Sequence, residues 1–181
     1  METTEMSRLT RPDPVLRVCS CLTAIPSLLP QARADLARAF GDVDLESDPF
    51  PFEGTDYYRE EMGERLQRTW FVFRELCGPE ELPDSRIATA RIEEDHSKQG
   101  KRRINLDPGY LDLGKLVLAS LKGAPDKIYL GRGVWAHTCL RYRFQGFEAP
   151  DHSFPDFKDG LYSDFFSRAR QHYKRRLPES S

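Results

Sequence analysis

The spacing of apolar residues in the first half of the chain predicts strands and helices in alternation. Apolar, β-branched and aromatic residues indicate strands over 15–24 and 68–76, and strict alternation indicates a short strand over 43–46. Between the strands expected at 15–24 and 43–46, apolar residues recur at helical spacing up to Gly41, a residue that typically ends a helix. A second helix is expected from Pro83 to near Gly100.

The second half predicts one more strand, two helices and a hairpin. A short extended piece at 102–107 should enter a Pro108-Gly109 turn, and the apolar run LGKLVLASLK after it is long enough for a helix. Residues 127–147 alternate around Gly131-Arg132-Gly133, as expected of a β-hairpin. The last amphipathic helix carries Leu161, Phe165, Phe166, Ala169 and Tyr173 on one face.

This order predicts an α+β fold with a ferredoxin-like split β-α-β core, followed by an additional helix, a β-hairpin and a C-terminal helix. We expect a flexible N-terminal arm over 1–13, a single domain over 14–177 and a frayed tail over 178–181. The length of 181 residues suits one core.

Charge and cysteine content narrow the classes of function. With 27 basic and 29 acidic side chains the net charge is −2, which argues against a dedicated DNA-binding protein. No apolar stretch reaches the length of a signal peptide or a membrane span. The four cysteines lack metal-knuckle spacing and read as buried thiols, so we expect a cytoplasmic protein without membrane contact.

No recognisable catalytic motif is present, and whether the protein is an enzyme stays open at this point. The chain has no phosphate-binding GxxxxGK[ST] string, no GxGxxG after a strand, no HExxH and no GxSxG. Gly131 and Gly133 are explained by a tight turn. His137 lies on an alternating strand and could act as a general base, although a strand histidine is more often a hydrogen-bonded residue.

The segment 102–110 has the densest polar chemistry, because two arginines, an amide and a carboxylate fall at a strand end. Its plain interpretation is a turn in which Arg103 pairs with a carboxylate. Its functional interpretation is an anion or nucleotide site with charge-assisted donors and stacking aromatics. The candidate ligand-binding residues are Tyr57, Tyr58, Arg103, Asn105, Asp107, Tyr110, Lys115, Lys122, Arg132 and Arg141, and Glu46, Asp56 and Asp107 are candidate ligands for Mg²⁺.

Several linked motifs follow one another in a fixed order between Pro14 and the last helix: the strings DLES, PFPF, TDYY and EMG, then KRRINLDPGYL, KLVLAS, IYLGRG and LRY. Together, in this order, they resemble the bacterial domain of unknown function 4416 family. The resemblance implies a bacterial protein of about this length, and it implies no established reaction.

Three functions from different classes remain. The first is a binding module for a nucleotide or phosphorylated small molecule, GTP and RNA included. The second is a metal-dependent phosphoryl- or nucleotidyl-transfer enzyme, which requires the carboxylates of Glu46, Asp56 and Asp107 to converge on a metal ion. The third is a protein–protein interaction domain, which requires an exposed apolar patch.

Overall fold

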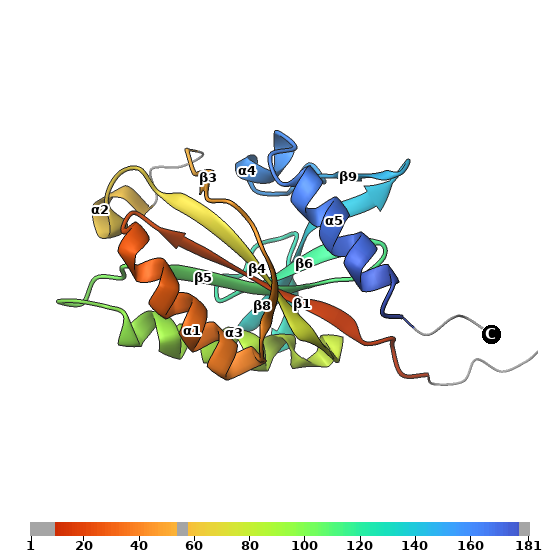
Figure 1. Ribbon diagram of the computed structural model, residues 1–181, viewed down its shortest axis with the longest axis horizontal. Coiled ribbons are helices and arrows are strands. Elements are labelled where there is room, and N and C mark those ends of the chain that lie inside the picture. Colours follow the sequence, from red (N-terminus) through yellow and green to blue (C-terminus); the bar gives the residue numbers. More distant parts are fainter. Residues whose placement is uncertain (1–9, 54–57, 178–181) are drawn as a thin grey trace, which may run out of the picture.

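A computed structural model describes residues 10–53 and 58–177 and shows an α+β fold built on one antiparallel sheet (Figure 1). Its main path runs in the order β2-β4-β1-β5-β6-β8-β7, and two short strands, β3 and β9, pair with β4 and β8. The outermost parts of the expected arm and tail, residues 1–9 and 178–181, lie outside the described residues. No helix within the described ranges is long and apolar enough to cross a membrane.

The strands and helices have the following bounds. The strands are β1 (Val15–Thr23), β2 (Val43–Glu46), β3 (Phe50–Pro51), β4 (Gln67–Cys77), β5 (Asn105–Leu111), β6 (Lys115–Ser120), β7 (Ile128–Gly131), β8 (Val134–Arg143) and β9 (Gly146–Glu148). The helices are α1 (Leu29–Phe40), α2 (Arg59–Met62), α3 (Leu82–Asp95), α4 (Pro155–Lys158) and α5 (Ser163–Lys174). Helix α3 therefore ends before the predicted boundary near Gly100.

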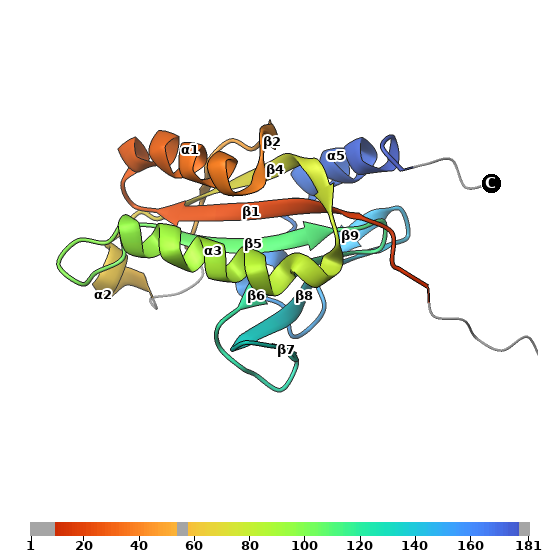
Figure 2. The same cartoon turned by 90° about the horizontal axis from the view of Figure 1, so that it is seen from below.

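Helices α1 and α3 cover one face of the sheet, as both views show (Figures 1 and 2). Leu36 and Phe40 of α1 pack against Cys19 and Cys21 of β1 and Phe73 of β4. These strand residues share one face because side chains along a strand alternate between the two faces. The predicted amphipathic α1 is confirmed, and its apolar stripe lies on this core.

Helices α4 and α5 cover only part of the opposite face (Figure 1). Trp70 is fully buried there and makes edge-to-face contacts with Phe157, Tyr162 and Phe166, whose ring centroids lie 5.9, 5.4 and 4.9 Å away. Leu16 and Val18 of β1 extend this core along the sheet. Farther along the same face, the strand residues that point to this face are polar instead of apolar. The candidate site lies where this change occurs.

The prediction of a helix in LGKLVLASLK was wrong, because this segment contains strand β6. Leu116 and Leu118 pack toward α5, while Val117 and Ala119 pack with Leu82 of α3. A strand that is buried on both faces reads as a continuous apolar run, which hydrophobic periodicity alone does not distinguish from a helix. The segment forms a strand because it pairs with β5 on one side and β8 on the other.

The predicted Pro108-Gly109 turn was also wrong, because both residues lie within β5. Pro108 pairs with Cys19 of β1, and the ladder to β6 begins at Gly109, which pairs with Leu118. A side chain at Gly109 would place its Cβ 2.3 Å from the Val117 carbonyl oxygen. Glycine is therefore needed here because the β6 backbone approaches closely.

Candidate functional site

A buried arginine, Arg68 of β4, lies at the centre of the polar part of this face. Its guanidinium Nη1 lies 3.5 Å from Asp107 Oδ2, and its Nε lies 3.5 Å from Asp156 Oδ2. The side chains of Arg68 and Asp156 are only 6% and 7% exposed. Burial lowers the pKa of Arg68, but the charges of Asp156 and Asp107 outweigh it and raise the pKa overall. Arg68 is therefore a buried cation between two carboxylates.

Asp107 of β5 is held from both sides by neighbouring polar residues. Ser20 of β1 lies opposite it and donates a hydrogen bond to Oδ2 at 3.3 Å, while the Asn105 amide donates to Oδ1 at 3.0 Å. The Asp107 side chain remains 24% exposed. Both carboxylate oxygens are thus oriented while part of the group still faces solvent. We refer to Ser20, Arg68, Asn105, Asp107 and Asp156 as the Asp107 cluster.

A second ion pair borders the cluster. Arg102 donates to both carboxylate oxygens of Glu61 on α2, at 2.8 and 2.6 Å, and to Asn105 Oδ1 at 2.9 Å. The hydrogen bonds from Arg102 lower the pKa of Glu61. The Arg102 guanidinium lies 5.8 Å from the ring centroid of Tyr58, whose pKa is raised to about 12 by burial and by the Asp107 charge. Aromatic and charged groups therefore meet beside Asp107.

On the β6–β8 side of the sheet lies a group made of Lys127, His137 and Phe154. The Lys127 ammonium donates a hydrogen bond to Ser120 Oγ at 2.8 Å. The pKa of Lys127 is lowered, mainly by burial and further by the Lys122 charge, although the charges of Cys139 and Asp107 act to raise it. His137 is 4% exposed, and neither ring nitrogen has a hydrogen-bond partner among the described residues. Burial, with Lys127 and His152, lowers the pKa of His137 to about 4. His137 is accordingly neutral near pH 7.

The structure brings together only part of the predicted ligand-binding set. Tyr58, Asn105 and Asp107 lie at the cluster, and Tyr57 lies outside the described residues. Arg103 is close in sequence, with its carbonyl accepting a hydrogen bond from Thr23, and its guanidinium has no ion pair or hydrogen bond in the described parts of the chain.

The remaining predicted cations and Tyr110 lie elsewhere. Tyr110 and Lys115 line a concavity of about 540 Å³ at the other end of β5, where Lys115 pairs with Asp112 at 2.5 Å. Arg141 lies opposite Lys115 on β8. Lys122 follows β6, and Arg132 in the β7–β8 turn pairs with Asp84 of α3. These residues do not converge with Asn105 and Asp107 on one ligand.

The carboxylates predicted to hold Mg²⁺ are not brought together either. Glu46 of β2 lies opposite Phe71 and pairs at 2.9 Å with Arg33 of α1, so it belongs to the α1 face. Asp107 belongs to the opposite face and lies on β5, which is separated from β2 by the two strands β4 and β1. Asp56 lies outside the described residues. Within residues 10–53 and 58–177, no three histidine, cysteine or acidic side chains are grouped to hold a metal ion.

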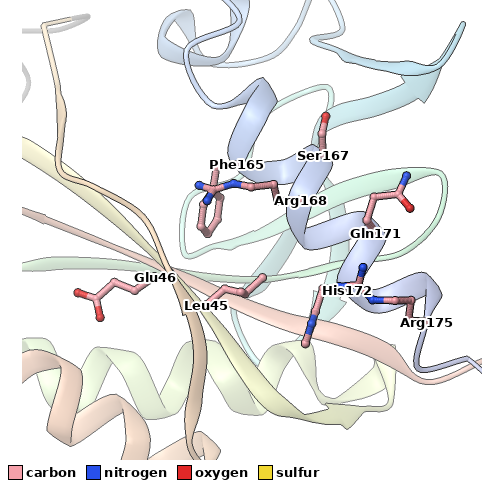
Figure 3. Close-up of a pocket in the computed structure, with 8 residues that line it drawn as sticks. All are labelled: Leu45, Glu46, Phe165, Ser167, Arg168, Gln171, His172 and Arg175. Carbon is pink, nitrogen blue, oxygen red and sulfur yellow. The ribbon is translucent and has the colours of Figure 1, made fainter.

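A separate cleft of about 420 Å³ lies between the edge strand β2 and helix α5 (Figure 3). Figure 3 shows Glu46 pointing away from α5, while Leu45 and His172 lie on facing elements. His172 Nε2 is 2.8 Å from Asp44 Oδ2, which ties α5 to β2. Of the predicted site residues that the structure describes, only Glu46 lines this cleft, and Arg168 and Arg175 line it from an exposed face of α5.

Sequence reasoning missed Ser20, Arg68 and Asp156. A signal for the first two was present, since each is a polar residue in the apolar alternation of a buried strand: Ser20 follows Leu16 and Val18, and Arg68 precedes Trp70 and Val72. Asp156 had no comparable signal, because it follows a proline-rich loop and reaches Arg68 only through the fold.

The fold and this cluster define a class: an α+β protein whose described residues form a nine-stranded antiparallel sheet with a partly exposed ionic cluster on one face. The family to which the chain belongs is identified from its sequence. Residues 13–173 match the model of the domain of unknown function DUF4416, and the chain belongs to that family, as its motifs indicated. No curated protein and no solved structure matches it.

Proposed function

We propose that this protein is a binding module for a nucleotide or another phosphorylated ligand, and that the ligand binds over the Asp107 cluster. The observation that carries the proposal is the pairing of buried Arg68 with Asp107 and Asp156. Burying an ion pair costs desolvation energy, and apolar residues of similar volume are often at least as stabilising. The same strands bury Trp70 and Val18 nearby, so folding alone does not call for charges here.

The chemistry of the cluster suits the base of a nucleotide. The partly exposed Asp107 carboxylate can accept hydrogen bonds from ring and exocyclic N–H groups. The half-buried Tyr58, whose ring centroid lies 6.0 Å from that of the buried Phe52, offers aromatic surface beside it. A base with adjacent N–H donors, such as guanine, matches this acceptor, which agrees with GTP as a candidate ligand.

A phosphate needs cations that the cluster has not already neutralised. Arg68 faces Asp107 and Asp156, and Arg102 faces Glu61, so these two arginines offer little net positive charge. Arg103 is the best candidate, because its guanidinium has no acidic partner in the described ranges. We therefore propose that Arg103 binds the phosphate while Asp107 and Asn105 bind the base.

The metal-dependent enzyme is a weaker proposal, because Glu46 and Asp107 lie on opposite faces of the sheet. A ferredoxin-like core remains a proposal as well. It is supported by the order β5-β1-β4-β2 together with α1 and α3 on one face. Mg²⁺, RNA binding and a cytoplasmic location stay predictions.

The test is a thermal-shift screen with GTP, ATP, their diphosphates and short RNAs, each with and without Mg²⁺. A ligand at about 100 times its Kd adds about 2.7 kcal/mol of stability, a shift of several degrees. We expect wild type to respond to a nucleotide, Asp107→Asn to lose the response, and Arg103→Ala to lose most of it for phosphorylated ligands only.

Glu46→Gln is the matched control, because it removes a carboxylate from the opposite face of the same sheet. It should respond as wild type does. A response that survives in Asp107→Asn but disappears in Glu46→Gln would place the site elsewhere. A flat screen with every compound would reject nucleotide binding, and a response to RNA alone would favour an RNA ligand.

A further inference from the structure

The cleft between β2 and α5, which we call the α5 cleft, contains two arginines that no acidic side chain neutralises. Arg168 and Arg175 line it from α5, and neither side chain makes an ion pair or a hydrogen bond within the described ranges. Asp164, one helical turn before Arg168, makes no ion pair with it there either. The guanidinium of Arg168 lies 5.9 Å from the ring centroid of Phe165. Both guanidiniums therefore remain able to bind an anion.

The acidic residues on the β2 side of the α5 cleft already have partners. Glu46 accepts a hydrogen bond from Arg33 at 2.9 Å, and Figure 3 shows it pointing away from α5. Asp44 lies 2.8 Å from His172 Nε2 and 3.7 Å from Arg74 Nε. Because these carboxylates are engaged elsewhere, the two arginines leave the lining of the cleft with uncompensated positive charge.

The helix dipole explains only one of the two arginines. The negative end of a helix stabilises cations in and beside the last turn, which accounts for Lys174 and Arg175 at the end of α5. Arg168 lies in the first half of this helix, where the dipole gives no such stabilisation. Its place beside a concave surface, together with Arg175, is explained by a ligand that uses both cations.

The size and lining of the α5 cleft narrow the ligand. Its volume of about 420 Å³ suits a small molecule, and its lining includes the apolar side chains of Leu45 and Phe165. Arg168 and Arg175 are two turns apart on α5, about 10 Å along the helix axis. A guanidinium matches carboxylate and phosphate equally in geometry. We propose that the α5 cleft binds a small molecule with an anionic group, carboxylate or phosphate, at each end of an apolar spacer.

The test is isothermal titration calorimetry of the full-length chain at low ionic strength, where salt screens exposed charges least. The probes are octanedioate and hexane-1,6-diyl bisphosphate, each with an anionic group at both ends of an apolar chain. We expect octanedioate to bind more tightly than octanoate, which has one anionic end, and than butanedioate, which is too short to reach both arginines. The tighter of the two probes identifies carboxylate or phosphate as the preferred group.

Variants locate the site. Arg168→Gln and Arg175→Gln should each weaken binding of the tighter probe about tenfold, because each removes one charge-assisted contact. The matched control combines Arg91→Gln with Arg141→Gln, which removes two exposed arginines without ion pairs in the described ranges, on α3 and β8. It should bind as wild type does, although its net charge equals that of the Arg168→Gln, Arg175→Gln double variant.

The α5 cleft shares no residue with the Asp107 cluster, so this proposal does not rest on nucleotide binding. Asp107→Asn should therefore keep its affinity for the tighter probe, whatever becomes of its response to nucleotides. The proposal is overturned if neither probe binds, if octanoate binds as tightly as octanedioate and the bisphosphate, or if the Arg91 and Arg141 control loses as much affinity as the cleft variants.

Discussion

Arg68 and Asp107 stand on strands β4 and β5, with β1 between them, and their charged atoms lie 3.5 Å apart. The contact crosses β1 above Ser20, whose hydroxyl donates to Asp107 and accepts from Arg68 at 3.4 Å. Three adjacent strands thus contribute one ionic group at the edge of the apolar core around Trp70. The free energies of unfolding of variants in this ionic group distinguish a structural role from a functional one.

Removing one member of this group should cost more stability than removing all of its charges. Arg68→Met leaves Asp107 and Asp156 without their shared cation, and breaking a buried ion pair from one side typically costs about 3–5 kcal/mol. The triple variant Arg68→Met, Asp107→Asn and Asp156→Asn buries no uncompensated charge. We expect it to recover most of the loss in urea unfolding.

The triple variant also tests the proposed function, because we expect it to fold but to give no thermal shift with nucleotide. A triple variant that remains as unstable as Arg68→Met would mean that the ionic group is required for folding. One that is stable and still binds would mean that the ligand does not use the cluster.

Gly109→Ala should strongly destabilise the sheet, since its Cβ would meet backbone. The new atom would lie 2.3 Å from the Val117 carbonyl oxygen and 2.5 Å from Leu118 Cδ2. We expect a loss of at least about 2 kcal/mol, in the range of overpacked core substitutions. Gly146→Ala is the matched control, because a Cβ there meets nothing within 4 Å, and its unfolding free energy should change by less than about 0.5 kcal/mol. Equal effects would contradict the close approach of β6.

The same residues show where sequence-based prediction of the fold succeeds and fails. Strands β1 and β4 and helix α1 follow from local spacing, and the structure confirms them. Segments 108–109 and 115–120 were misassigned because their conformations depend on neighbouring strands: Gly109 accommodates the β6 backbone, and Val117 is buried between α3 and the sheet. Local pattern carries no information about such tertiary partners.

The residues of the candidate site could likewise be predicted only in part from the sequence. Asn105 and Asp107 were identified because they share a polar string, and they meet because residues i and i+2 of a strand share a face. Lys115 and Arg141 carry suitable charges but lie at the far end of β5, and which end a residue occupies depends on strand register. Asp156 reaches the cluster from 49 positions past Asp107 along the chain.

Burial should protect all four cysteines from alkylation. Burial is the first cause that raises the pKa of Cys19, Cys77 and Cys139, and it raises the pKa of Cys21 to about 12. Thiolate is the reactive form, so native protein near neutral pH should react with iodoacetamide far more slowly than protein unfolded in urea. Mass spectrometry would count the modified thiols. Rapid modification of Cys19 on β1 or Cys139 on β8 without denaturant would contradict the packing on the corresponding face of the sheet.

His137 should make the protein less stable as the pH falls below neutrality. Its pKa is lowered from 6.5 to about 4 in the folded state, by burial first and then by Lys127 and His152. The unfolded chain therefore binds a proton at higher pH than the folded chain does. Above about pH 6.5 the group has no effect, and between about pH 6.5 and 4 protonation favours the unfolded state increasingly.

Urea unfolding at a series of pH values measures this dependence. We expect His137→Leu to flatten the decline between about pH 6.5 and 4, because the substitution removes the proton that unfolding takes up. His152→Gln is the control for the neighbouring ring, whose centroid is 5.4 Å from that of His137, and it should keep most of the slope. If both variants decline as wild type does, carboxylates elsewhere account for the acid sensitivity, and His137 is hydrated or hydrogen-bonded in the folded protein.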